Sequence, residues 1–258
     1  MIEVRNLVKE LPLSKAQRKQ SGTKDKVARV VDEVSFTCHP GRVFTLLGPN
    51  GAGKTTTLRM IASILKPTSG SVTVAGYDIG KQRKQALAKM GFLTGSTGLY
   101  DRMNPNEIVR YFADLFHVDR SLFKQRKEYF FDLLDMNDFA GKKFGQLSTG
   151  MKQKVSIVRA LIHDPDVVVF DEPTSGLDVI TAEHIITLIR DLKAKEKTVI
   201  FSSHIMAEVE LLCDDLAIIH KGRLVFSDTI DAFREQMEAP SLTHEFIRQI
   251  NLANEPVK

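Results

Sequence analysis

The sequence LLGPNGAGKTTT, residues 46–57, decides how the chain is expected to fold. Its central part, GPNGAGKT, matches the pattern G-x-x-x-x-G-K-[ST] at every fixed position. The preceding RVFTLLG has the composition of a buried strand, and the following TTTLRMIASILK has apolar residues at helical spacing. These apolar residues are Leu58, Ile61, Ile64 and Leu65. Glycines in such a strand-to-helix turn let successive N–H groups face a polyphosphate, so the motif predicts a phosphate-binding loop.

Strand and helix patterns alternate from residue 42 to residue 228, as in α/β proteins. PDVVVFDEP and KTVIFSSH are apolar runs between breakers, which is typical of parallel strands covered on both faces. SVTVAGYDI predicts another strand, and LAIIHKGRLVFSD predicts a hairpin that turns at Lys221 and Gly222. Residues 106–140 have a helical pattern, with Ile108, Phe112 and Leu115 on one face. We expect one α/β unit with a mainly helical insertion at roughly residues 96–160.

The composition is ordinary for a globular protein that buries a substantial core. Of the 258 residues, 43% are hydrophobic and 26% are charged. No apolar run approaches the ~20 residues that cross a bilayer, and the N-terminal MIEVRNLVKELP lacks the pattern of a signal peptide. Cys38 and Cys213 fit neither a disulfide framework nor a paired metal motif. We therefore expect both to be small buried hydrophobic side chains in a reducing cytosol.

The chain is basic, with a formal net charge of +4 and a pI of about 9.0. This charge suits an anionic partner, either nucleic acid or the inner face of a membrane, without choosing between them. The excess is concentrated in SKAQRKQSGTKDKVAR, residues 14–29, which has six Lys or Arg against one Asp. No aromatic residues that could stack on bases are interleaved with these charges. We expect a solvated, mobile loop and no nucleic-acid partner.

Two adjacent carboxylates, Asp171 and Glu172, end the apolar run VVVF. Without a phosphate loop elsewhere in the chain, this pair would simply be interpreted as opening a turn. With the loop, Lys54 is expected to contact the β- and γ-phosphates, and Thr55 and Asp171 to hold Mg²⁺. Glu172 is then the expected base for the attacking water. His204 ends the run KTVIFSSH at the same sheet edge, where a polarising contact to the γ-phosphate is expected.

These residues resemble the ATP-binding-cassette (ABC) family over nearly the whole chain. LSTGMKQKVSIVRAL, residues 147–161, is similar to the start of the family's signature helix, and VVVFDEP, SGLD and SSH follow in the family's order. The resemblance implies ATP and Mg²⁺ as cofactors, with Thr55 and Asp171 at the metal and Lys54, Glu172 and His204 as catalytic residues. The nucleotide-binding residues that it implies in the phosphate loop are Gly48, Pro49, Asn50, Gly51, Ala52, Gly53, Lys54, Thr55 and Thr56.

The resemblance also implies a homodimer in which two subunits sandwich two ATP molecules head to tail. Ser148 and Gly150 of one subunit would cap the γ-phosphate held by the phosphate loop of the other. Asp178 would lie across the dimer interface and help couple the two sites. Considered without the family, LSTG is only a serine helix cap with a neighbouring glycine.

Within the family, LSTGMKQK, TSGLDV and GLYDRM most closely resemble ATP-binding subunits of bacterial ABC-2-type exporters, in particular the NatA-type sodium-extrusion ATPases. The implied fold is an α/β P-loop NTPase with a mixed, mainly parallel core sheet, an N-terminal antiparallel β subdomain and a helical insertion. We expect one ABC ATPase domain at residues 1–235 and a C-terminal extension at residues 236–258. The implied function is ATP hydrolysis that powers a separate ABC-2-type membrane permease from the cytoplasmic face of the cell membrane. Sodium, drugs, lipids and peptides are all candidate substrates.

Two segments depart from the pattern of the family. Leu11 occupies the position where many relatives carry an aromatic residue that stacks on adenine, so we expect loose base specificity. In GFLTGSTGLYDRMN, residues 91–104, Gly95 and Ser96 stand where most relatives have a glutamine. NatA-type sequences share this glycine-rich replacement. We interpret residues 91–104 as a joint between the nucleotide core and the helical insertion that faces the membrane subunit.

Two other functions are compatible with a phosphate loop. A non-transport ABC protein that acts on ribosomes or DNA would be expected to carry a second cassette or a long coiled coil, and neither pattern occurs in the sequence. A non-catalytic regulatory cassette would be expected to lack catalytic residues, whereas Lys54, Glu172 and His204 are present. The ATPase subunit of an exporter is therefore the preferred interpretation.

Overall fold

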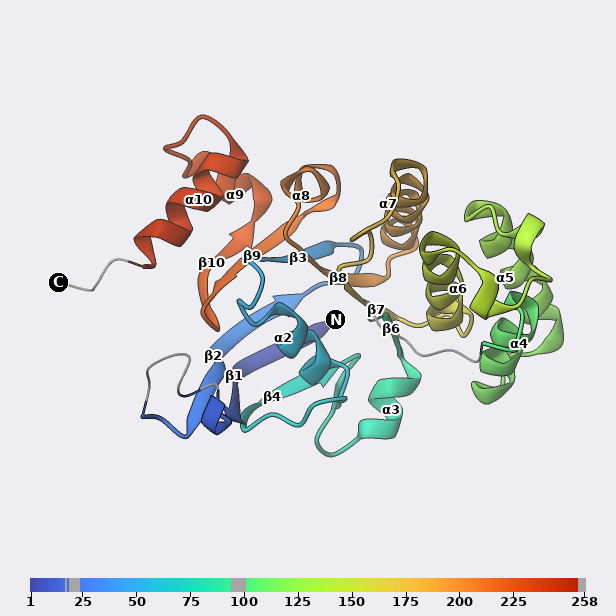
Figure 1. Ribbon diagram of the computed structural model, residues 1–258, viewed down its shortest axis with the longest axis horizontal. Helices are drawn as coiled ribbons and strands as arrows, with labels where there is room; N and C mark the ends of the chain where they lie inside the picture. The colour runs from blue at the N-terminus through green and yellow to red at the C-terminus, as the bar shows by residue number, and fades with distance from the viewer. Residues whose placement is uncertain (17, 19–23, 94–100, 255–258) are drawn as a thin grey trace.

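Two β-sheets organise the chain in the computed structural model, which describes residues 1–16, 18, 24–93 and 101–254. The larger sheet has six strands, in the order β10 (Arg223–Thr229), β9 (Asp215–His220), β3 (Val43–Leu47), β8 (Thr198–Ser203), β7 (Val167–Asp171) and β6 (Met90–Leu93). The smaller sheet has four strands, in the order β2 (Val27–Cys38), β1 (Ile2–Pro12), β4 (Ser69–Val74) and β5 (Tyr77–Asp78). Figure 1 shows both sheets near the centre of the molecule.

The larger sheet is parallel from β6 to β9, and β10 joins it in antiparallel orientation. Every residue of β3, β7 and β8 is buried, as expected for strands that are covered on both faces. The smaller sheet is antiparallel throughout. The predicted mixed, mainly parallel core sheet and the N-terminal antiparallel sheet are thus confirmed.

Two hydrophobic clusters cover the two faces of the larger sheet, because successive strand residues point to opposite sides. Phe44 and Val169 pack in one cluster with the smaller sheet and α2 (Lys54–Ile61). Val43 and Phe170 pack in the other cluster with α6 (Thr149–Leu161) and α7 (Val179–Ala194). The phosphate loop lies between β3 and α2, at the carboxyl end of the central strands.

The helices between β6 and β7 begin at polar caps. The Asn104 side chain accepts from the N–H of Glu107, whose own side chain accepts from the N–H of Asn104, at the start of α4 (Pro105–Leu115). Asp119 caps α5 (Arg120–Leu133) and Ser148 caps α6. The expected joint falls largely on residues 94–100, which lie outside the described residues. The expected domain limits remain a prediction.

The C-terminal helices lie at the opposite end of the molecule from α4 and α5 (Figure 1). Here α9 (Ile230–Glu235) and α10 (Leu242–Leu252) place Phe233 and Leu242 against Leu216 and Ile218 of β9. The side chain of Glu245, 1% exposed, accepts hydrogen bonds from Arg248, Gln249 and two backbone N–H groups, which lowers its pKa to about 2. Two further α-helices are α3 (Arg83–Ala88) and α8 (Met206–Leu212), and short 3-10 helices occur at Asn137–Phe139 and Phe144–Gln146.

None of the helices within the described residues combines the length and the hydropathy that a bilayer crossing requires. The predicted burial of both cysteines is confirmed, since Cys38 and Cys213 are buried and free. Burial raises the pKa of the Cys213 thiol to about 12. The hairpin turn at Lys221 and Gly222 is also confirmed, with φ values of 48° and 82° that suit a two-residue hairpin loop. Part of the basic segment, residues 17 and 19–23, lies outside the described residues.

The helix after the phosphate loop is shorter than the sequence pattern predicted. It ends at Ile61, and Ser63 takes a left-handed backbone conformation with φ of 54°. Ile64 lies beyond the helix and is 59% exposed, so it does not continue the helical spacing of the buried Leu58 and Ile61. The apolar spacing continued past the point where the backbone leaves the helix.

Two further local predictions were wrong in detail. SVTVAGYDI forms two strands, β4 and β5, because Ala75 and Gly76 turn the chain with positive φ values of 50° and 84°. The helical pattern of residues 106–140 is divided between α4 and α5, and His117 between them has φ of 55°. Leu115 at the end of α4 is 57% exposed and does not join the buried face.

Candidate phosphate-binding site

The phosphate loop packs closely against two distant parts of the chain. A Cβ atom on Gly53, where φ is 111°, would lie 2.7 Å from the carbonyl oxygen of Val30 in β2. A Cβ atom on Gly48 would lie 2.3 Å from the carbonyl oxygen of Ile219 in β9. The N–H of Gly222 donates to the carbonyl oxygen of Ala52 at 2.9 Å. The glycines are therefore needed for the loop to seat against β2 and the β9–β10 hairpin.

The Lys54 ammonium lies at the beginning of α2 and is only 4% exposed. Its Nζ donates to the carbonyl oxygens of Gly48 at 2.7 Å and Pro49 at 3.2 Å. It also lies 3.4 Å from Oε1 of Glu172. The cation is held in place by acceptors of its own loop, beside the carboxylate at the end of β7.

Thr55 and Asp171 meet across the site. Thr55 Oγ1 donates to Asp171 Oδ1 at 3.0 Å, and Ser202 Oγ donates to the same oxygen at 2.8 Å. Among the described residues there is no group of three or more His, Cys, Asp or Glu that could hold a metal ion. Mg²⁺ needs no such cluster, because it is commonly held by one or two protein oxygens together with phosphates and water. The hydroxyl of Thr55 and the carboxylate of Asp171 therefore fit Mg²⁺.

Glu172 takes a left-handed backbone conformation with φ of 49°, directly after β7. Its Oε1 lies 3.3 Å from Nδ1 of His204, which follows β8. Glu172 borders two cavities, of about 180 Å³ and about 380 Å³. The first is lined by Val30, Glu172 and residues 50–56 of the loop, and the second includes Thr55, Asp171 and Gln153. The cation, the carboxylates and the imidazole thus meet beside space for a ligand.

The residues expected to act on a partner's nucleotide lie at two neighbouring helix starts. Ser148 Oγ accepts from the N–H of Met151 at the start of α6. A Cβ atom on Gly150 would lie 3.2 Å from Oγ1 of Thr181. Asp178 begins α7 and accepts from the N–H and Oγ1 of Thr181, both at 2.9 Å, which holds its pKa below the ordinary value. Ser148, Gly150 and Asp178 line neither of the two cavities, although Thr149, which lies between the first two, lines the second cavity together with Thr55.

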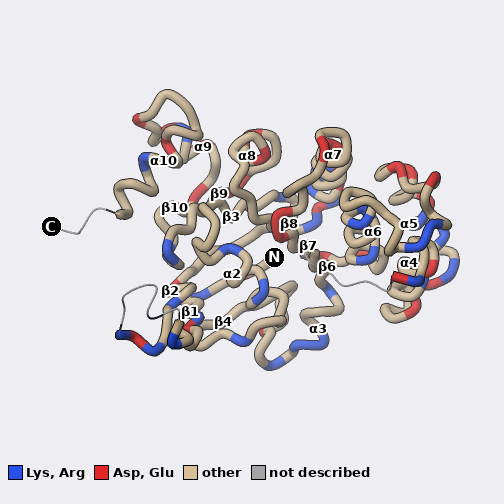
Figure 2. Tube along the Cα trace, viewed as in Figure 1, with Lys and Arg blue, Asp and Glu red and all other residues tan. Residues whose placement is uncertain are grey.

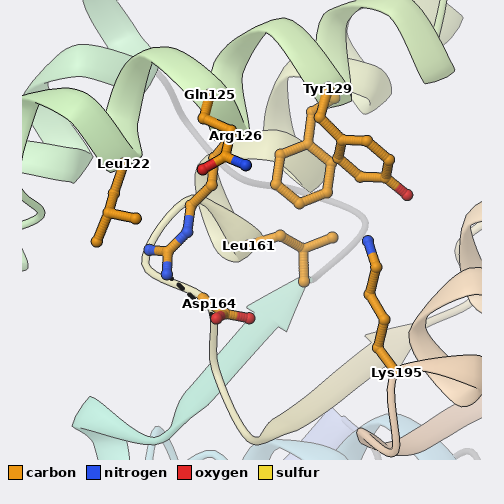
Figure 3. Close-up of a pocket in the computed structure, with 8 residues that line it drawn as sticks. Leu122, Gln125, Arg126, Tyr129, Leu161, Asp164 and Lys195 are labelled. Carbon is orange, nitrogen blue, oxygen red and sulfur yellow. Dashed lines mark hydrogen bonds and ion pairs between the residues drawn. The ribbon is translucent and has the colours of Figure 1, made fainter.

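A further cavity of about 380 Å³ lies beside α5 and the ends of α6 and α7. Arg126 pairs there with Asp164 at 3.1 Å, as the dashed line in Figure 3 marks. Lys195 pairs with Asp191 at 2.9 Å and lies 4.0 Å from the centre of the Tyr129 ring. The cations at this cavity are already paired, and the phosphate loop is the better candidate for an anionic ligand.

Comparison with known proteins places the chain in a family. Residues 31–175 match the family model described as "ABC transporter". The chain is 43% identical over 228 residues to the ABC transporter ATP-binding protein NatA of Bacillus subtilis (strain 168), which covers 88% of this chain and 93% of that protein. The chain belongs to the ABC transporter family. The predicted family is therefore confirmed.

Two other ABC proteins extend the likeness. The Nod factor export ATP-binding protein I of Burkholderia pseudomallei (strain 1710b) is 38% identical over 205 residues, which is 76% of this chain and 64% of that longer protein. A solved structure of an ATP binding subunit of an ABC transporter has a TM-score of 0.84 and 26% identity, and the match covers 96% of this chain and 99% of that one. The predicted ABC ATPase fold is confirmed by this match.

Three residues at the site of this ABC protein were not predicted from the sequence. Val30 lines the phosphate-loop cavity, whereas Leu11, the expected counterpart of the stacking aromatic, does not line it. Ser202 bonds both Asp171 and the N–H of Glu172, at 2.8 and 3.0 Å. Strand pairing could have revealed Ser202, because parallel β7 and β8 put it beside Asp171. Val30 and the third missed residue, Gln153, have no comparable local signal.

Proposed function

We propose that this chain is the ATP-hydrolysing subunit of an ABC exporter. The observation that carries the proposal is the meeting of Lys54, Glu172 and His204 beside the phosphate loop. These side chains come from α2 and from the segments after β7 and β8, yet Glu172 lies 3.4 Å from Lys54 and 3.3 Å from His204. Thr55 and Asp171 adjoin them, 3.0 Å apart. Hydrolysis of a nucleoside triphosphate uses this combination of cation, metal ligands and base.

Each side chain has a role that follows from its chemistry. Lys54 and the loop N–H groups would bind the β- and γ-phosphates and stabilise the charge that develops on them. The carboxylate of Glu172 would accept the proton of the attacking water, while His204 orients that carboxylate through their contact. Thr55 and Asp171 would hold Mg²⁺, which neutralises phosphate charge when bound.

The exposed surface at the start of α7 supports an ATP-dependent homodimer. Val179 and Ile180 directly follow Asp178 and are 85% and 71% exposed. Two neighbouring apolar side chains at this exposure suit contact with another protein surface. In the proposed dimer, Ser148 and Gly150 of one subunit cover the phosphate loop of the other, which places these helix N-termini toward the phosphates.

A groove of about 600 Å³ supports a separate membrane permease as the second partner. It lies between α2 and α3 on one side and α4 and α6 on the other, and β6 forms its floor just before the expected joint. Ile64, Leu115 and Phe116 contribute exposed apolar surface to it. Lys and Arg, but no acidic residue, lie on α3 at its edge (Figure 2). An ABC-2-type permease would dock here through an apolar segment with acidic flanks, at the cytoplasmic face of the cell membrane.

Export as the direction of transport rests on the relatives. One of them is a Nod factor export protein by its name, and the motifs LSTGMKQK and TSGLDV resemble those of the NatA-type sodium-extrusion ATPases. Sodium is therefore the substrate to test first, followed by drugs, lipids and peptides.

The test is ATP hydrolysis by the purified chain, alone and with its permease, in the presence and absence of Mg²⁺. We expect Glu172→Gln to bind ATP and to hydrolyse it at least ~100-fold more slowly, because the base is lost. Glu183→Gln, at an exposed ion pair on α7, is the matched control and should keep wild-type turnover. Retained turnover in Glu172→Gln would remove the base role, and an inactive wild-type protein in both settings would contradict the proposed function.

A further inference from the structure

Glu208 is a buried carboxylate that none of the roles proposed above employs. It lies in α8 and is 7% exposed. Its Oε1 accepts a hydrogen bond from the Thr174 hydroxyl, and its Oε2 accepts one from the Ser203 hydroxyl at 2.5 Å. Both hydroxyl residues are buried as well, at 7% and 2% exposure. Glu208 therefore joins two chain segments inside the protein.

The two segments are those that carry the proposed base and its imidazole partner. Thr174 lies two residues after Glu172, and Ser203 directly precedes His204. Ser203 Oγ also accepts from the N–H of Ile205 at 2.9 Å, so it fixes the backbone on both sides of His204. The carboxylate of Glu208 thus bonds to both turns. Its partner in the first turn is two residues from Glu172, and its partner in the second is one residue from His204.

The turn after β7 has further anchors, but they do not hold His204. The N–H of Glu172 donates to Ser202 Oγ, and the amide of Gln153 in α6 donates to the carbonyl oxygen of Pro173 at 2.8 Å. These bonds keep the turn in its left-handed conformation. Ser202 already joins that turn to the end of β8. The carboxylate of Glu208 adds a second link, which reaches Ser203 directly beside His204.

We propose that Glu208 is a positioning residue that sets the spacing between Glu172 and His204 during ATP hydrolysis. The proposal rests on the function proposed above. Hydrogen bonds from hydroxyls to a buried carboxylate are short and strong, so they restrict the relative movement of both turns. A misplacement of about 1 Å at a reacting group can lower a rate by roughly 100-fold. Loss of the link should therefore reduce turnover without changing the phosphate loop.

The first test is Glu208→Gln. The amide puts a donor NH2 group where one carboxylate oxygen accepts, and it removes the negative charge that strengthens both hydrogen bonds. We expect kcat to fall by at least ~10-fold, while the Kd for ATP changes by less than about 3-fold, because the Glu208 carboxylate bonds to the hydroxyls of Thr174 and Ser203 and not to the phosphate loop. Thr174→Val removes only the hydroxyl on the Glu172 side and should reproduce the fall in kcat. It carries the test if Glu208→Gln fails to fold.

Glu245→Gln is the matched control for the loss of a buried carboxylate. Glu245 is 1% exposed and lies in α10, away from the site. This variant should have a lower Tm and an unchanged kcat. A fall in kcat equal to that of Glu208→Gln would overturn the proposal, because it would show a general effect of destabilisation.

A double-mutant cycle separates positioning from stability. If Glu208 acts through the contact between Glu172 and His204, then Glu208→Gln should lower kcat by less than about 2-fold in a His204→Ala background. Fully additive losses, or wild-type kcat in both Glu208→Gln and Thr174→Val, would overturn the proposal. If the wild-type protein hydrolyses ATP and the Glu208 variants have the same kcat, only this inference is contradicted. If the wild-type protein is inactive, the proposed function itself is contradicted.

Discussion

The serine at position 202 connects the two halves of the proposed catalytic machinery. Its hydroxyl donates to Asp171 at 2.8 Å and accepts from the N–H of Glu172 at 3.0 Å, and the residue is fully buried. One hydroxyl therefore satisfies both a proposed metal ligand and the backbone of the proposed base. A buried polar group that loses its hydrogen-bond partner destabilises the folded state, so removal of this single oxygen atom should lower the free energy of unfolding.

We expect Ser202→Ala to lower the free energy of unfolding by about 1–3 kcal/mol, because it leaves the part-buried N–H of Glu172 without its acceptor and removes the hydroxyl that donates to Asp171. Urea denaturation followed by circular dichroism measures the change. Ser71→Ala, at an exposed position of β4, should stay within about 0.5 kcal/mol of the wild-type value. Equal effects at both positions would contradict the role given to Ser202.

The side chain of Val30 leads to a prediction about base specificity. It lines the phosphate-loop cavity with an aliphatic side chain, which offers neither an aromatic face nor hydrogen bonds to a base. We therefore expect kcat/KM values for ATP and GTP within about 10-fold of each other. Steady-state hydrolysis of both nucleotides gives the ratio, and strong preference for ATP would count against loose base specificity.

Among the elements, α4, α6 and β6 meet at His163. Its ring stacks on Phe116 with centroids 3.8 Å apart, and its Nε2 lies 3.2 Å from the carbonyl oxygen of Met90. Burial lowers the pKa of His163 to about 4. The junction between these elements is thus built around a neutral imidazole, and acid should weaken it.

The sign of this effect follows from proton binding. Between pH 6.5 and 4 the unfolded chain protonates His163 and the folded chain does not, so stability is present above that range and is lost as pH falls through it. The lost stability is about 3 kcal/mol for a shift of this size. We expect His163→Gln to flatten the decline of the unfolding free energy between pH 7 and pH 4. The exposed His39→Gln should leave the decline as it is in the wild type.

Sequence patterns predicted the elements whose signals are local. The strands β3, β7 and β8 are continuous apolar runs, and the turn at Lys221 and Gly222 has residues that accept positive φ. The helix limit at Ile61 was missed because the apolar spacing continues to Ile64 after the backbone has turned away. Turns that depend on a residue with positive φ, such as Ser63, are hard to predict when that residue is not glycine.

Part of the candidate site was also predictable, because several of its residues belong to local sequence patterns. Lys54 and Thr55 belong to a contiguous motif, and Asp171, Glu172 and His204 end apolar runs. Gln153 in α6 and Glu208 in α8 contact the turn after β7 through residues that are 20 and 34 positions away in the sequence. Such contacts depend on how the helices pack, and no spacing in the sequence encodes them.

For the whole molecule, the start of α7 is the surface at which the proposed dimer can be tested. Val179→Asp adds a charge where Val179 is 85% exposed, at the first position of the helix, where an acidic residue is compatible with the helix dipole. We expect the variant to fold and bind ATP, but to lose the ATP-dependent dimer, because the charge would be desolvated at the interface.

Sedimentation of Glu172→Gln with and without Val179→Asp, in the presence of ATP, measures the dimer. Leu252→Asp, at an exposed apolar position of α10, is the matched control and should still dimerise. A dimer that persists in the Val179→Asp protein would place the interface elsewhere.

The phosphate loop packs against a hairpin that lies much later in the sequence. The loop lies at residues 48–55, but the carbonyl of Ile219 and the N–H of Gly222 pack against it from the β9–β10 hairpin. During synthesis at roughly 5–20 residues per second, the ribosome must add more than 160 residues after the motif before that hairpin exists. A nascent chain therefore contains the nucleotide motif for many seconds before the nucleotide site can form, and ATP can stabilise the subunit only after the β9–β10 hairpin has been synthesised.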